Sequence, residues 1–160
     1  MQLAAVVLLS CLGSWQAPKV GVVDPRALVI AFYRSELWRN ELKARREEME
    51  AAKRAGDRRK AAELERWGRE AQRLAHRQLA GKAPLDNIWN AIAPLLPEIA
   101  AKAGVEQVVP ESPPGVEAVD VTPLLLDALG TDETTRRWIE RMQEKSRRPP
   151  PGRAVRKGKP

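Results

Sequence analysis

One segment decides how this sequence folds: residues 26–55, which read RALVIAFYRSELWRNELKARREEMEAAKRA. The segment contains neither proline nor glycine, and its apolar residues recur every three or four positions, which is the spacing of one helix face. A helix rises roughly 1.5 Å per residue, so thirty residues extend about 45 Å, which exceeds the size of a small core. We therefore expect one long helix whose outer half projects into water.

A glycine and an aspartate follow this helix. Gly56 suits the end of a helix, and Asp57 suits the cap of the next one. Beyond them the apolar residues Leu64, Trp67, Ala71 and Leu74 have the spacing of a coiled-coil seam. We expect residues 26–80 to form a helical hairpin, a projecting coiled-coil arm with its tip at Gly56 and Asp57. A helix that continues through Gly56 is the alternative, because three basic residues would otherwise lie in the positive first turn of the second helix.

Three short runs have the composition of strands: residues 19–23, 105–109 and 116–121. Asp24 and Pro25 follow the first run and suit the cap and the first position of a helix. A carboxylate at the end of a strand can also be catalytic, but capping is a sufficient explanation here. Three short strands make a poor isolated sheet, so we expect an α+β fold with a small β body that oligomerisation completes.

The remaining helices are marked by their prolines. A helix is expected over residues 85–103, kinked or split at Pro94 and Pro97 and closed by Gly104. Thr122 is expected to cap the next helix, because Pro123 suits its first position. A last short helix is expected within residues 131–144, before the basic end of the chain.

The first residues resemble an export signal. Residues 3–12 read LAAVVLLSCL, an apolar run of about ten residues, whereas a membrane-spanning helix needs about 20. We therefore assign residues 1–17 to a signal peptide or a lipoprotein signal. Cys11 follows Leu8, Leu9 and Ser10, and these four residues resemble a lipobox. Cys11 is therefore a candidate for lipidation and membrane attachment. As the alternative, Cys11 is a small apolar residue inside a signal that is removed.

The net charge of +7 is located in the last sixteen residues. Residues 145–160 contain seven Lys and Arg and no acidic residue, which leaves 21 of each sign in residues 1–144. This Pro-rich stretch is expected to be a disordered, solubilising tail. The alternative is contact with anionic lipid, cell-wall polymer or nucleic acid, although nucleic acid is not our expected partner. The candidate anion contacts are Arg147, Arg148, Arg153, Arg156, Lys157 and Lys159. We expect the helical arm itself to be nearly balanced in charge.

Three motifs resemble one known family. They are VGVVDPRAL at residues 20–28, AGVEQVV at 103–109 and AVDVTPLLLDAL at 118–129. Together they resemble the OmpH family of periplasmic chaperones over about residues 19–130. The resemblance implies a homotrimer whose strands join in a small shared barrel and whose helical hairpins surround a cavity. It also implies a periplasmic location and clients that are unfolded or outer-membrane proteins.

The residues that catalysis usually needs are scarce. His76 is the single histidine and lies in the charged arm, where a surface position is expected. The sequence has no Gly-rich phosphate loop, no GxSxG and no CxxC, so we expect no enzyme activity and no cofactor or metal. The favoured hypothesis is an exported chaperone-like protein. The alternative is a membrane-tethered coiled-coil protein with a structural or interaction role in the cell envelope.

Overall fold

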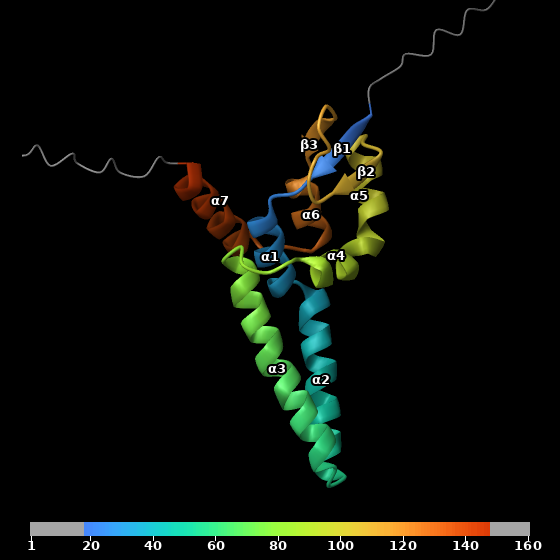
Figure 1. The fold of residues 1–160 in the computed structure, drawn as a ribbon, viewed down its shortest axis with the longest axis vertical. Helices are drawn as coiled ribbons and strands as arrows, with labels where there is room; N and C mark the ends of the chain where they lie inside the picture. The colour runs from blue at the N-terminus through green and yellow to red at the C-terminus, as the bar shows by residue number, and fades with distance from the viewer. Residues whose placement is uncertain (1–17, 148–160) are drawn as a thin grey trace, which may run out of the picture.

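The computed structural model describes residues 18–147, which fold mostly as helices beside a small sheet (Figure 1). The sheet has the strand order β2-β1-β3, with strands β1 (Lys19–Val22), β2 (Gln107–Val109) and β3 (Glu117–Asp120). β1 pairs parallel with both neighbours. The prediction of helices combined with three short strands is confirmed, and each strand lies inside the run that predicted it.

The central strand needs a glycine at Gly21. A Cβ atom there would lie 2.9 Å from Cγ1 of Val121 and 3.2 Å from Cγ2 of Val108. Such distances are shorter than ordinary van der Waals contact, so β1 packs closely against its neighbours because this residue has no side chain.

Helix α1 (Pro25–Arg34) forms the centre of the core. Oδ1 of Asp24 accepts hydrogen bonds from the backbone N–H groups of Arg26, at 2.8 Å, and Ala27, at 3.0 Å. The predicted capping role of Asp24 is therefore confirmed. All residues from 27 to 32 are buried, and Leu28 is completely so.

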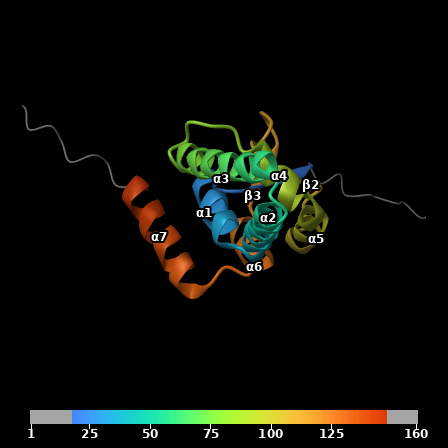
Figure 2. The same cartoon turned by 90° about the horizontal axis from the view of Figure 1, so that it is seen from below.

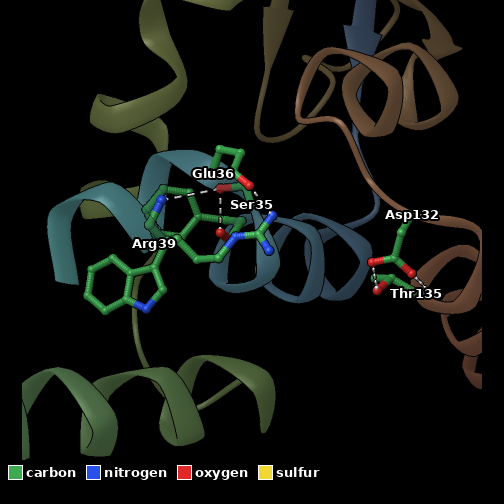
Figure 3. Close-up of polar contacts among 7 residues, drawn as sticks. Ser35, Glu36, Arg39, Asp132 and Thr135 are labelled. Carbon is green, nitrogen blue, oxygen red and sulfur yellow. Dashed lines mark hydrogen bonds and ion pairs between the residues drawn. The ribbon is translucent and has the colours of Figure 1, made fainter. Parts of the chain in front are cut away.

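The prediction of a single helix over residues 26–55 is wrong, because the helix is interrupted at Ser35. α1 ends at Arg34, and α2 covers Glu36–Arg54. Ser35 has extended backbone angles, and its hydroxyl donates a 2.7 Å hydrogen bond to the carbonyl oxygen of Phe32. Oγ of Ser35 in turn accepts a 3.4 Å hydrogen bond from the N–H of Trp38. Figure 3 shows the turn at Ser35. One serine thus ends α1 and begins α2.

The chain turns between α2 and α3 (Arg58–Leu79), so the helix does not continue through Gly56. Gly56 has a φ of 74°, and Oδ1 of Asp57 accepts a 2.9 Å hydrogen bond from the N–H of Lys60. α2 and α3 then lie side by side and extend away from the sheet (Figures 1 and 2).

The helix predicted over residues 85–103 is split at its prolines, as expected. It consists of α4 (Asp86–Ile92), the 3₁₀ turn η1 (Ala93–Leu95) and α5 (Leu96–Ala103). Gly104 ends α5 with a φ of 65°. These helices line the core with three fully or nearly fully buried side chains, those of Ile88, Ile92 and Ile99.

Thr122 does not have the predicted capping role at α6 (Thr122–Ala128). Its hydroxyl instead accepts a 2.9 Å hydrogen bond from the N–H of Asp24, and Oδ1 of Asp120 accepts one from the N–H of Thr122. The threonine hydroxyl is therefore engaged in joining α6 to the start of α1, which lies 98 residues earlier.

The last helix is longer than predicted. α7 (Glu133–Arg147) continues into the segment that we assigned to the disordered tail, so residues 145–147 are helical. α7 lies beside α1 (Figure 2), where Ile139 is buried. The guanidinium of Arg34 lies 5.0 Å from the ring centroid of Trp138. These contacts with α1 stabilise α7, so the helix is longer than we predicted from composition alone.

Candidate functional site

Most of the site residues predicted from the sequence lie outside the described residues. Cys11 lies before Pro18, and Arg148, Arg153, Arg156, Lys157 and Lys159 lie after Arg147. Arg147 itself is the last residue of α7. The structure therefore does not test the lipidation site or the anion contacts.

Residues 18–147 contain neither a helix that could span a membrane nor a cluster of metal ligands. No helix in this range has both the length and the apolar character needed to cross a membrane. Within the same range, no three side chains of the types His, Cys, Asp and Glu come together as metal ligands. His76 is exposed on α3, which agrees with its predicted surface position.

A row of aromatic rings joins α1 to the α2 and α3 pair. The centroids of Tyr33 and Trp38 are 5.0 Å apart, with the rings at 89°, and Trp38 lies 6.0 Å from Trp67 of α3. Phe32 lies 5.2 Å from Tyr33. Aromatic pairs at such distances stabilise packing beyond the area that they bury. All but Phe32 are half-buried, so the row is accessible to a ligand.

Two hollows adjoin this row, and both are lined by Tyr33, Trp38, Trp67 and Ala71. The hollow nearer the turn at Gly56, here called the tip hollow, has a volume of about 490 Å³. Its further lining includes Leu42, Arg45, Arg46, Met49 and Leu64. The hollow nearer the sheet, here called the base hollow, measures about 590 Å³. Its further lining includes Phe32, Leu37, Glu41, Glu70 and Leu74. Both volumes are in the range of sites that bind a small molecule or a few side chains.

The apolar side chains of this pair are incompletely covered. Within α2 the one buried residue is Ala52, and within α3 they are Ala61 and Gln78. Leu37 exposes 44% of its surface and lies on the wall of the base hollow. Two helices packed side by side leave an apolar surface open to solvent, and such surfaces mark interaction sites.

Ion pairs join α2 to α3 close to the turn at Gly56. Nζ of Lys60 lies 2.8 Å from Oε1 of Glu48, and Nζ of Lys53 lies 3.5 Å from Oε1 of Glu65. The hydrogen bond from Lys60 lowers the pKa of Glu48, and the same contact raises the pKa of Lys60. Both groups are exposed, so the pairs orient the helices more than they stabilise them.

The base of the pair is held by a buried amide. Gln78 exposes 3% of its surface, and its Oε1 accepts a 2.7 Å hydrogen bond from the hydroxyl of Tyr33. Its Nε2 donates to Oδ1 of Asn87 and to the carbonyl oxygen of Pro84, both at 2.6 Å. Burial raises the pKa of Tyr33, partly offset by the hydrogen bond with Asn87. The network fixes the end of α3 against α1 and α4.

The outer surface of α3 carries a face of arginines that we did not predict. Five arginines at the spacing of one helix face form what we call the arginine face: Arg59, Arg66, Arg69, Arg73 and Arg77. Within residues 18–147, Arg66, Arg69 and Arg73 are exposed and make no ion pair. Unpaired cations so close together produce a positive potential along the helix.

The prediction that the arm is nearly balanced in charge is wrong. Residues 26–80 contain 15 Lys and Arg against 9 Asp and Glu. Most of the acidic residues that balance these cations in the count for residues 1–144 lie after residue 80. Counting by segment and placing the arginines on a helical projection would have identified the arginine face from the sequence, because its spacing follows the helix period.

A third hollow lies where α1, the end of α3 and α7 meet. It measures about 740 Å³ and is lined by Asp24, Ile30, Leu85 and Gln143, among others. Oδ1 of Asp24 caps α1, and its Oδ2 accepts a 3.0 Å hydrogen bond from Nε2 of Gln143. Since hydrogen bonds engage both carboxylate oxygens, the role of Asp24 in this hollow is structural.

Comparisons of this chain with protein-family models, with curated proteins and with solved structures found no match. The resemblance to the OmpH family therefore rests on the three quoted motifs alone.

Proposed function

We propose that this chain is an exported, chaperone-like protein that binds unfolded or outer-membrane polypeptides in the periplasm. The α2 and α3 pair serves as a projecting coiled-coil arm that contacts the client. The observation that carries the proposal is the open apolar surface between these helices, with Trp38 and Trp67 at its centre. An unfolded polypeptide exposes the apolar side chains that such a surface can cover.

The arginine face supports the same proposal. Positive charge attracts segments of net negative charge and raises the rate of encounter, and it does not require a defined client sequence. Apolar contact in the tip hollow then retains the client once it has arrived. A surface of this kind binds many sequences weakly, which suits a protein that holds unfolded chains.

We propose a homotrimer, as the family resemblance implies. β2 and β3 are both outer strands, so each has one edge without a strand partner within residues 18–147. Pairing of these edges between subunits would satisfy the backbone groups there. Light scattering of the full chain tests this point, because a monomeric molar mass at all concentrations would contradict it.

The direct test of client binding is an aggregation assay. An unfolded outer-membrane protein is diluted from urea with or without this chain, and light scattering is followed over time. We expect suppression at near-stoichiometric ratios that is weakened by charge reversal of Arg66, Arg69 and Arg73 to Glu. Charge reversal of three exposed cations outside the arm that also make no ion pair within residues 18–147, Lys82, Arg141 and Lys145, is the matched control. No suppression at excess chain would contradict the proposal.

The second candidate is a membrane-tethered structural or interaction protein of the cell envelope. The observation that favours it is the LLSC sequence that ends at Cys11. In this case Cys11 is lipidated, and the α2 and α3 pair acts as a spacer or partner-binding element. Metabolic labelling with a palmitate analogue distinguishes the two, because labelling that is lost in Cys11→Ser supports the anchor and an unlabelled chain excludes it.

A further inference from the structure

The base hollow has walls of a particular chemistry. Four aromatic rings line it, those of Phe32, Tyr33, Trp38 and Trp67, and two carboxylates, Glu41 and Glu70, stand beside them. The rings of Tyr33 and Trp38 meet at 89°, so they form two walls of a box. The faces of aromatic rings carry partial negative charge and attract cations.

One of these rings, that of Trp67, already contacts a cation of the protein. The guanidinium of Arg45 lies 5.2 Å from the ring centroid of Trp67, on the side of the tip hollow that Arg45 lines. Arg45 does not line the base hollow. The base hollow therefore combines aromatic walls with no cation of its own among its lining residues.

The two carboxylates differ in what they already bind. Oε1 of Glu41 lies 2.9 Å from Nε of Arg45, so its charge is partly compensated. Glu70 makes no ion pair within residues 18–147 and is exposed at the edge of the hollow. A cation inside the hollow would gain Glu70 as a counter-charge.

From these features we propose that the base hollow is a binding site for a quaternary ammonium group, such as the choline group of a free metabolite or of a lipid headgroup. A primary ammonium has three N–H donors and a guanidinium five, and each needs an acceptor when it leaves water. Apart from the carboxylates, the hollow offers few free acceptors, because Oδ1 of Asn87 is already bound to Gln78. A quaternary ammonium has no N–H donor and needs only aromatic faces and a nearby negative charge.

The site is tested by titration of the ¹⁵N-labelled full chain with choline, at about 0.15 M salt to screen the arginines of α3. We expect saturable shifts of the indole N–H signals of Trp38 and Trp67, with about millimolar affinity. The signals of Trp89 and Trp138, which do not line the hollow, should stay in place. Trp38→Phe and Trp67→Phe assign the signals.

Two comparisons make the test specific. The uncharged isostere 3,3-dimethyl-1-butanol should bind much more weakly, and Glu70→Gln should weaken choline binding about threefold, as loss of an exposed charge pair does. Glu140→Gln, an exposed residue of α7, should leave the affinity unchanged. Equal binding of the uncharged isostere, or shifts that do not saturate by about 100 mM, would overturn the proposal.

Separate arms identify the source of the group. Saturation by free choline alone assigns the site to a soluble ammonium ion, whereas shifts with phosphatidylcholine vesicles and not with phosphatidylglycerol vesicles assign it to a headgroup. The inference does not rest on the chaperone function, since suppression of aggregation and choline binding are measured separately and can fail independently.

Discussion

The hydroxyl of Tyr33 donates a 2.7 Å hydrogen bond to Oε1 of Gln78, and this contact joins the last turn of α1 to the last turn of α3. The two residues are 45 positions apart, with the whole of α2 and most of α3 between them. The position of both helices relative to the sheet depends on this junction, because Gln78 also binds Asn87 and Pro84.

Removal of the Gln78 side chain should destabilise the protein. Gln78→Ala leaves the hydroxyl of Tyr33 and the carbonyl oxygen of Pro84 without their partner in a partly buried place, at a cost of about 1 to 3 kcal/mol. Urea unfolding followed by circular dichroism measures the change. Gln72→Ala, on an exposed turn of the same helix, should change the free energy of unfolding by less than about 0.5 kcal/mol. Equal effects of the two substitutions would show that the network contributes nothing.

Two glycine substitutions should change the free energy of unfolding in opposite directions. Gly21→Ala places a Cβ atom 2.9 Å from Val121 in the central strand, which should cost about 1 to 3 kcal/mol through overpacking. Gly68→Ala in α3 meets no atom within 4 Å and should stabilise the protein by about 0.5 to 1 kcal/mol. Thermal unfolding of both variants checks the pair, and a stabilised Gly21→Ala would contradict the packing described for the sheet.

The features that were predictable from the sequence act locally. Asp24 caps α1, Gly56 turns the chain, and Pro94 and Pro97 split a helix, because in each case the residue itself restricts its own backbone. The three strands were recognisable because they are short β-branched runs between turn residues. Their parallel order, with β1 in the centre, depends on contacts between residues about 90 positions apart, which no local pattern specifies.

The features that were missed depend on context. The helical spacing of apolar residues continues across Ser35, so periodicity alone predicted one helix. The break is decided by a serine that hydrogen-bonds both helix ends. Threonine is common as a helix cap, but the hydroxyl of Thr122 accepts a hydrogen bond from the N–H of Asp24 in a distant segment. The aromatic row was not predicted as a site, because Trp38 and Trp67 meet across two helices.

The stability of the protein should depend on pH through Asp132. This carboxylate accepts hydrogen bonds from the N–H of Thr135, at 2.8 Å, and from its hydroxyl, at 2.9 Å (Figure 3), and these bonds lower its pKa. A lowered pKa in the folded state contributes stability above the unfolded pKa of about 3.9, and the contribution is lost as the pH falls through the folded value.

Comparison with Asp132→Asn isolates this effect. The variant should be less stable than the wild type at neutral pH, and the difference should shrink as the pH falls through the lowered pKa of Asp132 in the folded state. Urea unfolding at several pH values measures it. A difference that is the same at all pH values would mean that the charge of Asp132 contributes nothing to stability.

The central claim, that the α2 and α3 pair binds client polypeptide, is tested most directly by photo-crosslinking in the full chain. A benzophenone amino acid replaces Leu42, which lines the tip hollow, or Arg137, which is exposed on α7. Both proteins are irradiated with an unfolded outer-membrane protein. The account predicts a crosslinked product from position 42 and little from position 137. Equal products from both positions, or none from position 42 while aggregation is still suppressed, would contradict it.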